Sequence, residues 1–179
     1  FCILKDSREN LWIGTRYVGL FKRDSKSGKW ENIIPRDFFS PVAPLSAPIS
    51  VNCILEDNFH SLWVGTSEGL LKLVYNQSKN SYDIFTCYPE KDKPGSIGGK
   101  NITSLLIDSE QIMWIATEDG GISKLTSRLN DNLPLKFEVF NYSIQSRLKL
   151  NSNSINVIVE DQNKRIWIGT GTNGIIQYD

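Results

Sequence analysis

Two pairs of adjacent carboxylates are the first places where this sequence could do chemistry. Glu56 and Asp57 stand side by side, and Glu160 and Asp161 repeat the pair near the carboxyl end. A glycosidase needs two carboxylates that flank one bond, one as acid and one as base or nucleophile. Because neighbouring residues of a strand point to opposite faces, adjacent acids at a strand end do not meet this need. These pairs therefore do not predict a glycosidase site.

The other reactive side chains are one histidine and three cysteines. His60 lies in a polar segment whose counterparts elsewhere in the chain are Glu9, Gln111 and Lys164, so the position does not require a base and indicates no catalytic triad. The cysteines cannot all pair within one chain and lack metal-binding spacing, which favours small buried side chains. They are Cys2, Cys53 and Cys87. No glycine-rich phosphate loop follows a strand and opens a helix. We predict no catalytic residue, no metal and no cofactor in this chain.

Charge and hydropathy argue against two classes of partner. The chain has 179 residues, of which 20 are basic and 20 acidic, so no net positive field attracts nucleic acid or anionic lipid. No apolar run approaches the roughly 18 residues of a membrane-spanning helix, and no charged and apolar leader is present. We expect neither nucleic-acid binding nor direct membrane contact by this chain, and we expect any export signal to lie outside it.

One pentapeptide recurs four times and organises the whole chain. It reads LWIGT, LWVGT, MWIAT and IWIGT, and the intervals between its tryptophans are 51, 51 and 53 residues. Such spacing predicts a repeat architecture. Because the sequence opens at Phe1 part-way through a copy, we expect it to be a piece of a larger protein. The four tryptophans are Trp12, Trp63, Trp114 and Trp167.

Two further positions keep the same register, and we predict structural roles for both. An aspartate lies six residues before each tryptophan, where its carboxylate can accept backbone N–H bonds in the following turn. The glycine or alanine of the pentapeptide leaves room for large side chains of the neighbouring sheet, and the tryptophan supplies matching bulk. The aspartates are Asp6, Asp57, Asp108 and Asp161, and the small residues are Gly14, Gly65, Ala116 and Gly169.

Each complete copy reads as four short strands, and no helix is predicted. In the second copy the predicted strands are 51–56, 62–66, 70–75 and 82–88. The strands lack a clean alternation of polar and apolar residues, as in sheets covered on both faces. Stacked four-stranded units of about 50 residues form a β-propeller. We therefore predict an all-β fold of antiparallel strands, about three and three-quarter blades of one propeller segment, with blades near 1–49, 50–100, 101–153 and 154–179.

The extended motif resembles the two-component regulator propeller repeats. It reads Asn-x-Ile-x-x-Asp-x-x-x-x-Leu-Trp-Ile-Gly-Thr-x-x-x-Gly-Leu, is fullest at 52–70 and 156–175, and departs from the pattern at Ala116. The resemblance covers the whole chain. It implies the periplasmic sensor region of a hybrid two-component protein of Bacteroidetes, with an oligosaccharide ligand and a histidine kinase outside this chain in an inner-membrane parent. Family propellers usually have seven blades, so further blades of the same protein, a second copy in a homodimer, or a small four-bladed closure would complete the ring.

The expected ligand face is formed by the long links between blades and by the turns between second and third strands. These segments share one face of a propeller disc, and long insertions mark working surfaces. The links are 34–50, 89–100 and 143–154, and the first carries four prolines that stiffen it. Aromatic rings and planar polar groups suit a sugar. The predicted ligand-binding residues are Arg16, Tyr17, Phe38, Phe39, Glu68, Glu118, Asp119 and Asn173. The alternative is that these turn residues are only solvated and that the two phenylalanines fold back onto the sheets.

Two other functions stay open from the sequence. A kelch-like scaffold for protein interaction has a similar period, but its Gly-Gly doublet precedes an aromatic pair, whereas here the tryptophan precedes the glycine. A non-catalytic propeller attached to a polysaccharide-degrading enzyme would share the same blades. The neighbouring domains of the full-length protein would distinguish a kinase parent from a hydrolase or lyase.

Overall fold

The structure is a computed structural model that describes residues 2–35, 38, 49–90, 93–130, 134–142 and 150–178. In this described part of the chain fifteen strands form four antiparallel sheets, so the predicted all-β class is confirmed. Each copy of the repeat builds one sheet, and within every sheet the strands follow one another in chain order. This meander arises because short polar turns separate the apolar runs of each copy.

Three sheets have four strands and the last has three. The first sheet contains β1 (Cys2–Lys5), β2 (Leu11–Gly14), β3 (Gly19–Arg23) and β4 (Trp30–Pro35). The second contains β5 (Val51–Glu56), β6 (Leu62–Thr66), β7 (Gly69–Asn76) and β8 (Ser81–Cys87). The third contains β9 (Ile102–Ile107), β10 (Met113–Thr117), β11 (Ile122–Leu125) and β12 (Phe137–Phe140). The fourth contains β13 (Ile155–Glu160), β14 (Ile166–Thr170) and β15 (Ile175–Tyr178).

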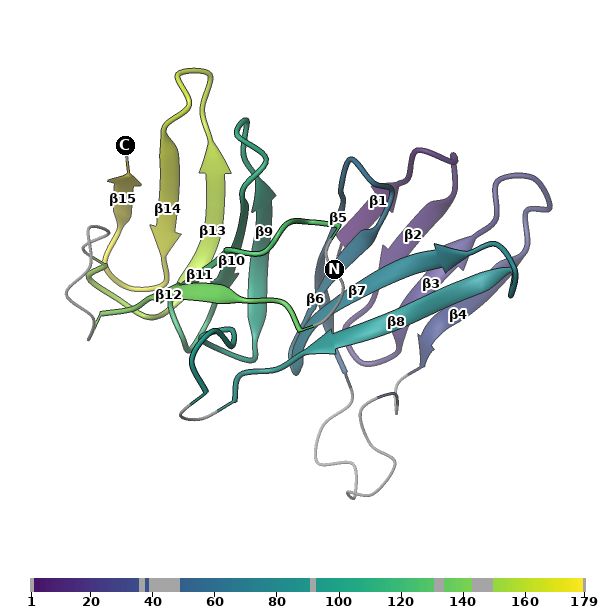
Figure 1. Cartoon of the computed structure of the whole chain (residues 1–179), viewed down its shortest axis with the longest axis horizontal. Coiled ribbons are helices and arrows are strands. Elements are labelled where there is room, and N and C mark those ends of the chain that lie inside the picture. Colours follow the sequence, from purple (N-terminus) through teal and green to yellow (C-terminus); the bar gives the residue numbers. More distant parts are fainter. Residues whose placement is uncertain are drawn as a thin grey trace.

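The first strand of each sheet lies on the inner side of the array. Strand β1 contacts β5, β5 contacts β9, and β9 contacts β13, so the four sheets fan out from these strands (Figure 1). The two middle sheets are covered on both faces, and β6 and β10 are accordingly buried at all five positions. Strands β2 and β14, in the first and fourth sheets, are buried only at alternate positions or less.

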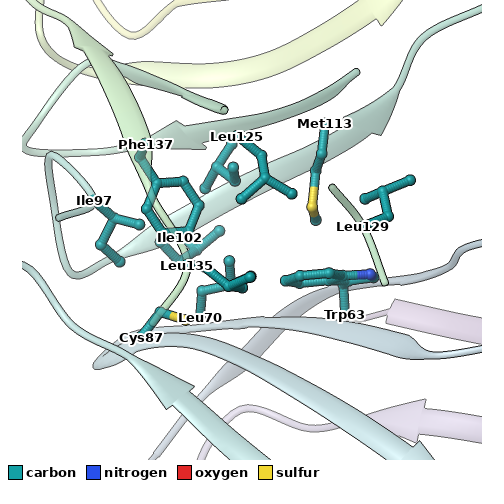
Figure 2. Packing of buried hydrophobic residues seen from close by; sticks show 11 residues of the cluster. Trp63, Leu70, Cys87, Ile97, Ile102, Met113, Leu125, Leu129, Leu135 and Phe137 are labelled. Carbon is teal, nitrogen blue, oxygen red and sulfur yellow. The ribbon is translucent and has the colours of Figure 1, made fainter. Parts of the chain in front are cut away.

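Each space between neighbouring sheets holds its own hydrophobic core. The core between the second and third sheets brings Trp63 and Leu70 against Ile102, Met113 and Leu129 (Figure 2). Equivalent clusters surround Trp12 between the first two sheets and Trp114 between the last two. Because each large side chain is shared by two sheets, burial of the tryptophans holds neighbouring repeats together.

The described residues include no helix long and apolar enough to cross a membrane.

Candidate functional site

The aspartate that lies six residues before each tryptophan closes a turn and also binds the tryptophan of its own repeat. In the second sheet, Asp57 Oδ1 accepts hydrogen bonds from the backbone N–H groups of Phe59 and Ser61, each at 2.9 Å. Its Oδ2 accepts one from Trp63 Nε1 at 2.8 Å. All four repeats have the corresponding indole bond, at 2.7 to 2.8 Å. The aspartate thus fixes both the turn and the ring that fills the space between sheets.

This turn also contains the histidine, and its position has the same backbone conformation in all four repeats. Residues His60, Glu9, Gln111 and Lys164 all have φ between 61° and 67°, a left-handed conformation set by the turn. The His60 Nδ1 atom lies 2.8 Å from Ser7 Oγ and 3.3 Å from Glu56 Oε1. A catalytic triad needs one ring nitrogen toward the serine and the other toward the acid. Here one nitrogen faces both groups, so the cluster does not form that relay.

The small residue of the pentapeptide lies against the next sheet. A Cβ atom added to Gly65 would stand 2.6 Å from Ile102 Cγ2 and 2.4 Å from Cys53 Sγ, and Gly14 meets Val51 and Cys2 in the same way. The third repeat has Ala116, and its partner across the sheet is the smaller Ser104. Burial raises the pKa of the Cys53 thiol to about 12. All three cysteines are free and serve as packing residues.

The threonine that ends the pentapeptide closes the turn at the opposite end of the sheet. Thr117 Oγ1 donates to the carbonyl oxygen of Gly121 at 2.9 Å and accepts from the N–H of Gly120 at 2.9 Å. The same pair of bonds occurs at Thr15, Thr66 and Thr170. Sequence reasoning missed this role, although the threonine recurs in all four copies and a glycine with positive φ follows it each time.

The turns closed by these threonines share one face with the links between sheets. The N–H of Ser67 donates to Ser50 at 2.9 Å, and the N–H of Glu118 donates to Asn101 at 2.9 Å. The link also passes very close to the turn in the third sheet, because a Cβ atom on Gly120 would lie 2.1 Å from the Gly98 carbonyl oxygen. The described parts of the links therefore lie beside these turns, and we call the surface that they share the link face.

Two predicted carboxylates on the link face contact adjacent residues of the link between the second and third sheets. Lys100 Nζ lies 3.4 Å from Glu68 Oε2, and the side-chain amide of the adjacent Asn101 donates a hydrogen bond to the Glu118 carboxylate. Asn52 reaches the same segment and donates to Asn101 Oδ1 at 3.0 Å. The turns of the second and third sheets thus present two acids joined by an ammonium group and an amide.

The remaining predicted residues are spread along the same face. The Arg16 guanidinium lies 5.4 Å from the Tyr17 ring centroid, and Tyr17 is 50% exposed with φ of 139°. The Asn173 side-chain amide donates to the carbonyl oxygen of Asn151, and the Asn151 side-chain amide donates to the carbonyl oxygen of Asn173. Asp119 lies in the turn that is packed against Gly99. Among the residues that the structure describes, no contact joins Tyr17 or Asn173 to the two acids.

The two predicted phenylalanines differ in what the structure describes. Phe38 is partly buried and packs against the core cluster around Trp12. This packing agrees with the alternative given for Phe38, in which the ring folds back onto the sheets. Phe39 and the prolines at 41, 44 and 48 lie outside the described residues. Within the described part of the chain, no group of three or more histidine, cysteine, aspartate or glutamate residues is arranged to hold a metal ion.

Stacked four-stranded antiparallel units, each closed by an aspartate–tryptophan pair, define the chain as a propeller-type repeat protein. The family model described as two component regulator propeller matches residues 45–68, 96–119 and 149–172. Three segments of the chain, in the second, third and fourth copies of its repeat, are therefore similar to the repeats of that family. A comparison with curated proteins gave no significant match.

Solved structures show the same arrangement in longer proteins. The extracellular domain of the putative hybrid two component system BT4673 from B. thetaiotaomicron is 28% identical over 99% of this chain, with a TM-score of 0.66. That of BT3049 from the same organism is 23% identical over 99% of the chain, with a TM-score of 0.69. PorZ, a surface component of the type-IX secretion system of Porphyromonas gingivalis, is 18% identical over the full chain, with a TM-score of 0.62. The chain spans 21% of each B. thetaiotaomicron domain and 25% of PorZ.

Proposed function

We propose that this chain is a non-catalytic, ligand-sensing part of a periplasmic sensor region in a hybrid two-component protein, and that its link face recognises an oligosaccharide. Support for the sensor role comes from the three matched repeats and from the likeness to the extracellular domain of BT4673. The kinase that reads the signal belongs to the parent protein, outside this chain.

The observation that carries the ligand proposal is the group of Glu68, Lys100, Asn101 and Glu118 on the link face. Carboxylates, an amide and an ammonium group at one place offer both acceptors and donors to sugar hydroxyls. Tyr17 adds an exposed ring on the same face, and its backbone is held in a region that is costly for a tyrosine. Strain of this kind concentrates at functional sites.

Further repeats of the same polypeptide would cover the outer faces of the first and fourth sheets. Ile3 is 70% exposed on β1, and Ile175 is 73% exposed on β15. The corresponding faces of the middle sheets are buried by a neighbouring sheet. The greater length of the solved relatives supports this completion of the ring.

Calorimetric titration with xylo-, manno-, galacto- and galacturono-oligosaccharides tests the ligand proposal. We expect at least one series to bind, and we expect both Tyr17→Ala and Glu118→Gln to weaken it. Phe59→Ala is the matched control, since Phe59 is 55% exposed in a turn at the opposite end of its sheet. Binding that is unchanged in both link-face variants would remove the link face from the ligand site.

A further inference from the structure

A second surface lies between the first and second sheets, at the end opposite the link face. It is a groove of about 930 Å³, formed by the β1–β2 and β3–β4 turns and by the ends of β7 and β8. Trp30, Tyr75 and Tyr82 line it together with polar turn residues. Trp30 is the tryptophan outside the repeat pattern, and it is 52% exposed. We call this surface the outer groove.

The free charges of the outer groove are mainly positive. Arg8, Lys22, Lys26 and Lys29 line it, against Asp24 and Glu31. Asp24 is already satisfied, because its Oδ1 accepts from both the N–H and the hydroxyl of Ser27 at 2.7 Å. These bonds lower the pKa of Asp24 and keep it ionised within its own turn. Because four cations line the groove against two carboxylates, the groove complements an anionic partner.

The cations of the groove also restrict what can stack there. The Arg8 guanidinium lies 4.4 Å from the Tyr75 ring centroid, and Lys22 Nζ lies 5.4 Å from that of Tyr82. The Tyr82 ring further meets Trp12 and Tyr75 edge to face, at 5.2 and 5.3 Å. A sugar needs an open aromatic face, and Trp30 offers the most exposed ring in the groove. The faces of Tyr75 and Tyr82 are already occupied, so the groove offers a stacked sugar few open rings. A peptide that carries carboxylates for the cations and an apolar side chain for Trp30 fits the groove better than a sugar does.

The space between the second and third sheets shows what the corresponding lysine binds. Lys72 pairs with Trp63 across the sheet as Lys22 pairs with Trp12. Its buried Nζ donates to the backbone carbonyl oxygen of Leu129 at 2.6 Å. Leu129 belongs to the connection 126–136 between β11 and β12, and its side chain lies beside Trp63 (Figure 2). A segment of the chain's own backbone thus occupies this position.

The outer groove stays open because the corresponding connection is short. Strands β7 and β8 are joined by the four residues 77–80, whereas β11 and β12 are joined by residues 126–136. The carbonyl oxygen that Lys72 reaches belongs to Leu129 of this longer connection. The repeat therefore places a lysine that can donate to a carbonyl oxygen at both positions, Lys22 and Lys72. One is filled by the chain itself and the other faces a groove.

We propose that the outer groove binds an extended acidic peptide segment of another protein or domain. Lys22 donates to a backbone carbonyl oxygen of that segment, as Lys72 does to Leu129. Arg8, Lys26 and Lys29 pair with its carboxylates, and an apolar side chain packs on Trp30. The groove is a docking surface distinct from the link face, and it does not depend on the link face binding a ligand.

An array of immobilised hexapeptides in acidic, neutral and basic pools tests this proposal with the purified chain. We expect retention by the acidic pools, which fluorescence anisotropy then quantifies with the best labelled hexapeptide. Arg8→Gln and Lys22→Met should each weaken that binding by roughly fivefold or more. Lys124→Met is the matched control, since Lys124 holds the same repeat position beside Trp114, and it should leave binding within about twofold.

Intrinsic fluorescence locates the bound peptide. Trp30 is the most exposed tryptophan, so peptide binding should change the emission of the wild-type chain and not that of Trp30→Phe. Absence of any acidic preference on the array, or binding insensitive to Arg8→Gln and Lys22→Met, overturns the proposal. Tri-galacturonate that alters Trp30 emission where no peptide does would assign the groove to an acidic sugar and overturn it as well.

Discussion

Ser7 of the first sheet is held by Glu56 of the second through two hydrogen bonds. The Ser7 N–H donates to Glu56 Oε2 at 2.7 Å, and its hydroxyl donates to Oε1 at 2.6 Å. Ser109 and Glu160 repeat this pair between the third and fourth sheets, at 2.8 and 2.7 Å. Neighbouring repeats are therefore joined by polar bonds at the turns as well as by their apolar cores.

Loss of the carboxylate at Glu56 should weaken the contact between the first two sheets. We expect Glu56→Ala to lower the free energy of unfolding by about 1 to 2 kcal/mol, since bonds to a charged acceptor are lost at a partly exposed site. Urea denaturation followed by far-ultraviolet circular dichroism measures this change. Glu138→Ala, at an exposed position of β12, should stay within about 0.5 kcal/mol of wild type. Equal effects of the two variants would deny the pair any role in stability.

Asp57→Asn should destabilise the second repeat more than its similar shape suggests. The amide can still accept the two turn N–H bonds through its oxygen, but its NH₂ group then faces the donor Trp63 Nε1. A buried donor left without an acceptor costs about 1 to 3 kcal/mol, which is the loss we expect in thermal or chemical unfolding. Asp119→Asn, in an exposed turn, is the control. An Asp57→Asn protein as stable as wild type would show that the indole bond contributes nothing.

The pKa of Asp161 gives a prediction for acid conditions. The hydrogen bond from the Trp167 indole, followed by bonds from Arg165, lowers this pKa from 3.8 to about 2. Because the folded pKa lies below the ordinary value, the stabilisation is complete above about pH 4 and is lost as pH falls toward 2. Carbon-13 NMR of the carboxylate should show this titration. In Trp167→Phe the pKa should move back toward 3.8, and an unchanged value would exclude the indole as the cause.

Gly65→Ala should be strongly destabilising on its own and less so beside a smaller neighbour. The new methyl group would meet Cys53 Sγ and Ile102, and overpacking of this kind costs about 1 to 3 kcal/mol. The double variant Cys53→Ser, Gly65→Ala reproduces the Ser104 and Ala116 pair of the third sheet. A double-mutant cycle should therefore give a favourable coupling energy of about 1 kcal/mol. Strictly additive losses would contradict this account of the small residue.

The sequence predicted the sheets well because the same pattern of strands and turns occurs in four copies, and each copy forms one sheet. In the second copy, strands β5 and β6 begin and end at the predicted residues. The tryptophan's polar partner was not predicted, because Asp57 and Trp63 are six residues apart and only the folded hairpin brings them together. The buried position of Lys72 was missed for a similar reason, since its acceptor is the carbonyl oxygen of Leu129, 57 residues away.

The candidate sites were predicted less completely because they depend on how different sheets meet. The face shared by links and turns followed from the strand order, but the contacts of Glu68 with Lys100 and of Glu118 with Asn101 depend on the path of the link between them. Trp30 lay outside the repeat motif, so its position gave no signal of a groove. That groove is created by the length of the turn after Tyr75, relative to the longer connection in the third sheet.

The hydrogen bonds of the threonines also allow one turn of the link face to be replaced by another of different length. Thr15 bonds the carbonyl oxygen four residues later at Gly19, whereas Thr66 bonds the one three residues later at Gly69, so the same two anchors accept turns of different length. A turn grafted between such a threonine and glycine would keep the hairpin beneath it intact. Repeats can thus acquire different binding surfaces by exchange of the turn between threonine and glycine, while the strands of the sheet stay the same.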